Sequence, residues 1–168
     1  ALEKGIVTIN KNLDRLIKKE KISIIDKENT LKNISTYTNI SEAVSDIDLV
    51  IEAATENEKV KLEIFKTLDQ HCPSNTILAS NTSSISITKI ASVTNRPDKV
   101  IGMHFMNPVP IMKLVEIIKG YSTSNEVCEQ IEALSLKLDK VPVLVNDAPG
   151  FVANRILMPM INESIETL

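Results

Sequence analysis

The sequence contains few of the residues that build phosphate loops, metal sites and disulfides. It has four glycines in 168 residues, and no two of them lie close enough to form a loop that could cradle a phosphate. It has two histidines and two cysteines without metal-ligand spacing, so we expect no metal site. Cys72 and Cys128 lie far apart and form no CxxC pattern. We therefore expect free thiols in a reducing compartment, with the cytosol as the default.

Long apolar runs and a strong charge of either sign are also missing. No stretch approaches the roughly 20 apolar residues of a membrane helix. The first residues, ALEKGIVTIN, lack the basic and then apolar pattern of a signal peptide. The formal net charge is -3 at pH 7, which argues mildly against nucleic acid as the main partner. We therefore expect a cytoplasmic protein that has neither a membrane nor a nucleic acid as its partner.

What the sequence does contain is an alternation of strand and helix patterns. Apolar residues at every third or fourth position predict helices over 2–20 and 24–34. The later segments alternate in type, with strands predicted over 34–38, 48–54, 76–80, 99–105, 113–118 and 141–145, and helices over 41–48, 56–72, 84–94 and 124–140. This alternation predicts an α/β domain with a mostly parallel sheet.

Three of these segments carry more specific expectations. Apolar residues run without alternation through most of 48–54, which is typical of a strand that is buried on both faces. The helix that follows it should place Val60, Ile64 and Leu68 on one side, which we expect to face the core. Ser41 should be the N-cap of the short helix that precedes it.

The pattern changes at Pro149 and Gly150. Residues 151–168 predict one helix, so we expect one domain over 1–148 and the first helix of a second, helical domain over 149–168. A doubly wound nucleotide-binding fold opens with a strand and a glycine-rich turn, whereas this chain opens with a helix. We therefore expect that the first βαβ unit is missing and that the chain is cut at both ends.

Polar residues follow three of the predicted strands. Glu56 and Asn57 follow the first of them, the run SNTSS at 80–84 follows the second, and His104 and Asn107 close the third. Each cluster taken alone is explained by ordinary turn and cap chemistry. The carboxyl ends of parallel strands share one edge of a sheet, however, and ligands bind at that edge. The three clusters together therefore predict a binding or catalytic site.

His104 and Glu116 are equidistant from Pro110 in the sequence. A hairpin folded about this proline sets them directly opposite each other, with Cβ atoms about 4.5–5.5 Å apart, within reach of an imidazole–carboxylate hydrogen bond. Two interpretations stay open: a buried histidine satisfied by an acid, or an oriented histidine for acid–base chemistry. The GxSxG elbow of a serine nucleophile does not occur. We interpret His71, at the end of a predicted helix, as structural.

Three segments resemble the signature segments of a known enzyme family. ASNTSSISIT, GMHFMNPVPIMKLVEII and DAPGFVANRIL look like those of the L-3-hydroxyacyl-CoA dehydrogenases, and especially of their short-chain bacterial members. The resemblance runs over essentially the whole chain, with the three segments in the family's order. It implies a Rossmann-like NAD(P)-binding domain and a helical dimerisation domain, with the substrate between them and a homo-oligomer at full length.

The resemblance also implies roles for single residues. His104 would be the catalytic base and Glu116 its orienting partner. The residues implied to bind substrate are Ser83, Asn154, Asn12 and Lys19, and those implied to bind or lie beside the cofactor are Glu56, Lys61, Asn81, Ser83 and Asn107. The glycine-rich segment and the acidic residue that follows it in the family have no counterpart here. The choice between NAD and NADP therefore cannot be made from the sequence.

The implied activity is oxidation of a (S)-3-hydroxyacyl-CoA such as 3-hydroxybutyryl-CoA to the 3-oxoacyl-CoA, or the reverse reduction, with NAD or NADP. Two alternatives remain open. The chain could be the dehydrogenase segment of a multifunctional fatty-acid β-oxidation protein, or a non-catalytic piece that binds acyl-CoA or a nucleotide. Because the phosphate-binding segment has no counterpart, we expect these 168 residues alone to show little or no turnover.

Overall fold

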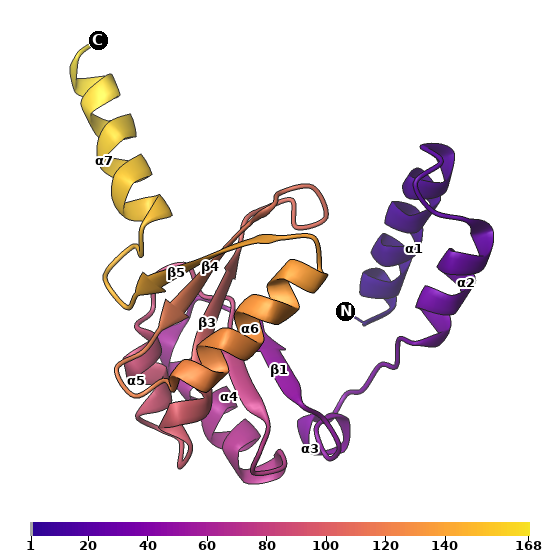
Figure 1. The fold of residues 1–168 in the computed structure, drawn as a ribbon, viewed down its shortest axis with the longest axis horizontal. Helices are drawn as coiled ribbons and strands as arrows, with labels where there is room; N and C mark the ends of the chain where they lie inside the picture. The colour runs from indigo at the N-terminus through magenta and orange to yellow at the C-terminus, as the bar shows by residue number, and fades with distance from the viewer. Residues whose placement is uncertain (1) are drawn as a thin grey trace. The chain divides into compact units, whose positions relative to one another are not determined.

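The computed structural model describes residues 2–168, which form two compact units that divide after Asn39. The first unit holds two helices, α1 (Leu2–Lys18) and α2 (Ile24–Lys32) (Figure 1). A salt bridge between Lys27 and Asp14, 2.5 Å long, joins them. Ser23 and Asp26 form a capping box at the start of α2, because the side chain of each accepts a hydrogen bond from the backbone N–H of the other.

A five-stranded sheet forms the centre of the second unit. Its strands are β1 (Leu49–Glu52), β2 (Ile77–Ser80), β3 (Val100–Phe105), β4 (Leu114–Lys119) and β5 (Val141–Asn146), in that order across the sheet. All neighbouring strands run parallel except β3 and β4, which are antiparallel. The prediction of a mostly parallel α/β sheet with an antiparallel hairpin is confirmed.

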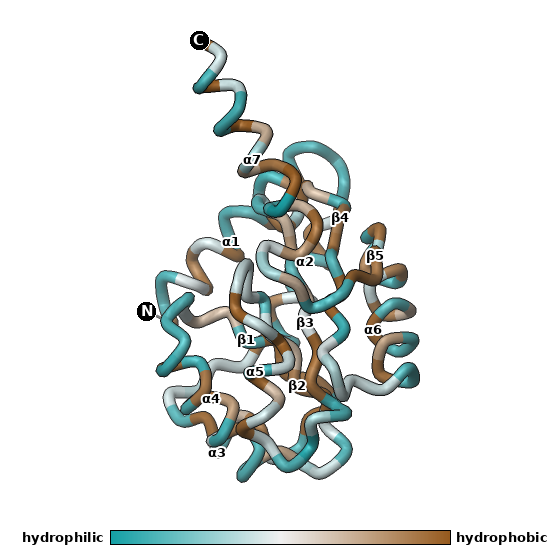
Figure 2. Tube along the Cα trace, turned by 90° about the vertical axis from the view of Figure 1, so that its left-hand side faces the viewer, coloured by the Kyte–Doolittle hydropathy of each residue, from teal (hydrophilic) through white to brown (hydrophobic). Residues whose placement is uncertain are grey.

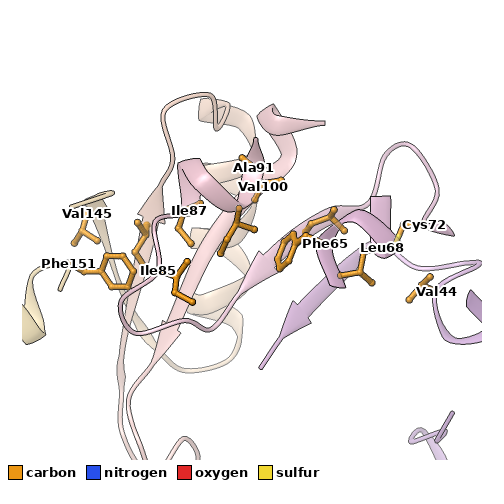
Figure 3. Packing of buried hydrophobic residues seen from close by; sticks show 13 residues of the cluster. Val44, Phe65, Leu68, Cys72, Ile85, Ile87, Ala91, Val100, Val145 and Phe151 are labelled. Atoms are coloured by element: carbon orange, nitrogen blue, oxygen red, sulfur yellow. The ribbon is translucent and has the colours of Figure 1, made fainter. Parts of the chain in front are cut away.

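Helices cover both faces of this sheet. On one face, α4 (Glu58–His71) and α5 (Ile87–Ala91) pack against alternate strand residues in a cluster that includes Phe65, Ile87 and Val100 (Figure 3). On the other face, α6 (Asn125–Lys137) packs against the intervening residues. Successive strand residues point to opposite faces, so His104 lies on the same face as Val100, toward α4 and α5.

The remaining elements are short or peripheral: α3 (Ile40–Ala43), the 3-10 turn Pro97–Lys99 and α7 (Ala153–Glu166). The predicted helix over 151–168 is confirmed by α7, which has no buried residue. Apolar and polar residues alternate along it (Figure 2). None of the helices in residues 2–168 is long and apolar enough to cross a membrane.

Close packing explains the glycine two residues before His104. A Cβ atom on Gly102 would lie 2.8 Å from Ile118 Cβ and 3.0 Å from Ile87 Cδ1. Real Cβ atoms essentially never approach other atoms so closely, so this position favours glycine. The glycine lets the first turn of α5 pack directly on β3 beside the histidine.

Several local predictions are wrong, and each has a physical reason. Residues 34–38 form no strand, because a short segment without a neighbouring strand gains no ladder of hydrogen bonds. Residues 41–48 are helical only as far as Ala43, and the helix already begins at Ile40, so Ser41 lies inside it and is not its N-cap.

The burial expected for two apolar segments is found only in part. Ile51 is 42% exposed because β1 is an edge strand of the described sheet. In α4, Leu68 is buried and Ile64 packs against the core, but Val60 is 47% exposed, and the other buried residues are Lys61 and Phe65. The aromatic ring sets the rotation of the helix, and burial of the lysine depends on an ion pair that periodicity cannot reveal.

Candidate active site

His104 and Glu116 are directly opposite each other on β3 and β4. The His104 Nδ1 atom lies 2.8 Å from Glu116 Oε2, and both side chains are buried. The geometry predicted from their symmetry about Pro110 is confirmed. Burial of both groups strengthens the electrostatic interaction between them, because the surroundings screen it less than water does.

The hydrogen bonds of the second Glu116 oxygen indicate which nitrogen of His104 carries the proton in the neutral ring. Oε1 accepts hydrogen bonds from the backbone N–H groups of Val152 (3.0 Å) and Ala153 (2.8 Å), where α7 begins. The carboxylate is therefore an acceptor on both sides, and we assign the proton to His104 Nδ1 on this network. In a neutral imidazole this leaves Nε2 as the nitrogen with a free lone pair. The Phe151 ring packs at a tilt with its centroid 5.7 Å from that of His104.

Glu56, Ser83 and Asn154 lie together in the structure. The backbone N–H of Ser83 donates to Glu56 Oε1 at 2.5 Å, and the Thr82 hydroxyl donates to Glu56 Oε2 at 2.7 Å. From the start of α7, Asn154 Nδ2 donates to the Ser83 carbonyl at 3.2 Å. Segments from three distant parts of the sequence therefore meet at one serine.

Lys61 lies in a buried ion pair that the sequence did not predict. Its ammonium donates to Glu52 Oε2 at 2.5 Å, and the two side chains are 2% and 3% exposed. Ser80 Oγ donates to the same oxygen, and the Ala54 N–H donates to the other. Burial opposes ionisation of Glu52, but these hydrogen bonds outweigh it and hold the pKa of that carboxyl below its usual range. Glu52, a charged residue inside a mostly apolar strand, was the one sign in the sequence of a buried ion pair.

The carboxyl ends of β1 and β2 open into a pocket of about 220 Å³. Its lining residues are Ala53, Ala54, Thr55, Glu56, Lys61, Asn81 and Ser83. Four of these are residues to which the resemblance gives a cofactor role. A larger pocket of about 470 Å³ opens at the amino ends of the strands beside α6, and no predicted site residue lines it. The smaller pocket is the candidate ligand site, because ligands of parallel sheets bind at the carboxyl edge.

Asn81 lines this pocket and also accepts a hydrogen bond from the Phe105 N–H at 2.9 Å, which ties the ends of β2 and β3. The remaining predicted site residues lie outside the pocket. Asn107 is exposed in the loop after β3 and does not line the pocket. Asn12 lies on α1, and Lys19 follows the last residue of α1, both in the first unit.

Asp147 is a further residue that the sequence did not single out. It accepts hydrogen bonds from Ser86 Oγ and from the backbone N–H groups of Ile87 and Thr88, at 2.7 to 3.1 Å. Burial opposes its ionisation, but the hydrogen bonds from Thr88, Ser86 and Ile87 outweigh burial and hold the pKa of the carboxyl below its usual range. The segment that leads from β5 to α7 is therefore anchored to Ser86 and the start of α5, three to five residues beyond Ser83.

The chain belongs to the 3-hydroxyacyl-CoA dehydrogenase family. The family model described as "3-hydroxyacyl-CoA dehydrogenase, NAD binding domain" matches residues 1–148. The chain is 52% identical over 165 residues to the 3-hydroxybutyryl-CoA dehydrogenase of Clostridioides difficile. The matched region covers 98% of this chain and 58% of that protein. It is 50% identical over 138 residues to the mitochondrial hydroxyacyl-coenzyme A dehydrogenase of Homo sapiens, over 82% of this chain and 44% of that protein.

A solved structure agrees with this assignment. The crystal structure of (S)-3-hydroxybutyryl-CoA dehydrogenase from Ralstonia eutropha matches 98% of this chain with a TM-score of 0.94 and 53% sequence identity. The match covers 58% of that protein, so this chain spans a little over half the length of such relatives. The Rossmann-like fold class is confirmed.

Proposed function

We propose that the full-length protein is an NAD-dependent dehydrogenase that interconverts a short-chain (S)-3-hydroxyacyl-CoA and the 3-oxoacyl-CoA. The observation that carries this proposal is the buried His104–Glu116 pair at the end of β3. The description of the matching domain as NAD binding supports NAD over NADP. The printed names of the bacterial relatives support 3-hydroxybutyryl-CoA as the substrate.

In this proposal His104 is the acid–base residue. Nε2 takes the proton from the C3 hydroxyl during oxidation and returns it to the forming alkoxide during reduction. Glu116 fixes the tautomer of the ring and stabilises the imidazolium that forms. The two α7 amides that bind the other carboxylate oxygen keep the acid in place.

The pocket at the carboxyl ends of β1 and β2 fits one end of a dinucleotide. Pockets for whole drug-sized ligands have volumes of roughly 300–1,000 Å³, so a pocket of about 220 Å³ would take a ring and its substituent rather than the whole cofactor. Glu56, Lys61, Asn81 and Ser83 would hold that end, and the bound nicotinamide would exchange the hydride with C3. Asn107 would approach the cofactor from the loop after β3.

Asn154 and Ser83 would hold the acyl end of the substrate near His104, and Asn12 and Lys19 would contact the CoA moiety. Exposed basic residues at the end of α1, Lys18 and Lys19, support the CoA assignment because they suit its phosphates.

The experiment is a steady-state assay of the full-length protein with acetoacetyl-CoA and either NADH or NADPH. His104→Ala should lower kcat by about 10²–10⁴-fold, the usual contribution of general acid–base catalysis, and Glu116→Gln should lower it less. His71→Ala is the matched control, because this exposed histidine ends α4 and lies outside the site. If the His104 and His71 variants keep the same rate, His104 is not the acid–base residue.

A further inference from the structure

We propose that Glu56 and Thr82 are positioning residues that aim the Ser83 hydroxyl into the cofactor pocket, and that Glu56 acts through Ser83 in addition to the cofactor contact that the family resemblance implies for it. The inference rests on the proposed function.

The backbone of Ser83 is fully occupied by protein partners. Its N–H donates to Glu56 Oε1 at 2.5 Å, and its carbonyl accepts from Asn154 Nδ2 at 3.2 Å. Within residues 2–168, the Ser83 hydroxyl is the only polar group of this residue that has no protein hydrogen bond. Ser83 also lines the 220 Å³ pocket. Its side chain is therefore the part that remains for a ligand.

Thr82 is fixed by its own hydrogen bonds. Its side chain is fully buried, and its oxygen accepts from the backbone N–H groups of Ile85 (3.0 Å) and Ser84 (3.3 Å). A hydroxyl has one hydrogen and two lone pairs. With both lone pairs used, the hydrogen has one direction left, toward Glu56 Oε2 at 2.7 Å.

Both oxygens of Glu56 are consequently engaged in holding the turn that carries Ser83. One binds the Thr82 hydroxyl and the other binds the next N–H along the chain, so the carboxylate spans two consecutive residues. Loss of either bond should loosen the turn. A displacement of about 1 Å in a positioning group can cost about 10²-fold in rate. The energetic effect of Glu56 should therefore appear in kcat through Ser83.

The test compares variants of the full-length protein in kcat and in the Kd for NADH. Thr82→Val keeps the shape but removes the hydroxyl, and we expect kcat to fall roughly 10- to 100-fold with the Kd nearly unchanged. Thr82→Ser should restore most of the rate. Thr76→Val is the matched control: Thr76 is also fully buried and donates to the Ile47 carbonyl at 2.7 Å, at the amino end of β2. It should lose stability but keep kcat.

Combining variants separates a direct from an indirect role of Glu56. If Glu56 acts through Ser83, Glu56→Gln should lower kcat in the wild-type background. In the Ser83→Ala background the same substitution should change kcat little. Fully multiplicative losses, or a weaker Kd for NADH at unchanged kcat, would overturn the proposal. Wild-type turnover of acetoacetyl-CoA tests the proposed function separately.

A second measurement needs no turnover. Amide hydrogen exchange at Ser83 and Ile85 should accelerate in Thr82→Val and Glu56→Gln and not in Thr76→Val. Unchanged exchange at both amides would show that the two side chains do not hold the turn, whatever reaction the protein catalyses.

Discussion

At the scale of single residues, the site is held together by carboxylates that accept hydrogen bonds on both oxygens. Glu52, Glu56, Glu116 and Asp147 all do so, and each joins segments that are far apart in the sequence. Hydrogen bonds to charged groups are stronger than those between neutral groups. The carboxylates therefore fix loop positions that apolar packing alone leaves free.

The buried Glu52–Lys61 pair should be costly to break from one side. Lys61→Met leaves an unpaired buried carboxylate, and we expect a loss of about 3–5 kcal/mol in the free energy of unfolding. The double variant with Glu52→Gln should recover part of this loss, because no buried charge remains. Urea denaturation of the full-length protein measures both. A single variant as stable as the wild type would show that the pair is open to water.

Asp147 should make the protein less stable in acid. The pKa of its carboxyl is lowered from 3.8 in the folded chain. A lowered pKa adds stability above the unfolded value, and this stability is lost as the pH falls through the folded value. The melting temperature of the wild type should therefore fall as the pH is lowered below about 4. The melting temperature of Asp147→Asn should fall less steeply over the same range, and this variant should be less stable than the wild type at pH 7. Parallel curves for the two proteins would contradict the role of this carboxylate.

At the scale of elements, long helices and the local hairpin could be predicted from the sequence, whereas tertiary contacts between distant residues could not. The helices α1, α4 and α6 and the hairpin of β3 and β4 follow from periodicity and from the prolines of the connection. His104 and Glu116 were predictable because a hairpin is local. The roles of Glu52, Thr82 and Asp147 depend on partners 9, 26 and about 60 residues away. Such contacts are fixed by the packing of the whole sheet and leave no periodic signal.

The packing of α5 on β3 should be sensitive to a single methyl group. Gly102→Ala places a Cβ within 3.0 Å of atoms of Ile118 and Ile87, so the helix or the neighbouring strand must shift. Overpacking of this kind costs about 1–3 kcal/mol. Gly5→Ala is the matched control, because no atom lies within 4 Å of the new Cβ in α1. There alanine should stabilise the helix by up to about 1 kcal/mol. Thermal unfolding of the two variants should shift in opposite directions.

At the scale of the whole molecule, α7 has an apolar stripe that the described chain leaves exposed. Leu157, Ile161 and Ile165 recur every four residues and are 41%, 44% and 64% exposed. Residues on one side of a helix recur in this way. This stripe supports the proposal that residues 149–168 open a helical domain through which the full-length protein forms a homo-oligomer.

The proposal predicts that a charge on this stripe damages the full-length protein. Burial of such a side chain contributes about 1.5–3 kcal/mol, and a buried carboxylate adds a desolvation penalty. Ile161→Asp should therefore lower the melting temperature or shift the protein toward monomer in light scattering. Asn162→Asp, at the next position and one of the polar residues of α7, should do neither. If the two variants match the wild type in both measurements, the stripe faces solvent and residues 149–168 do not open a packed helical domain.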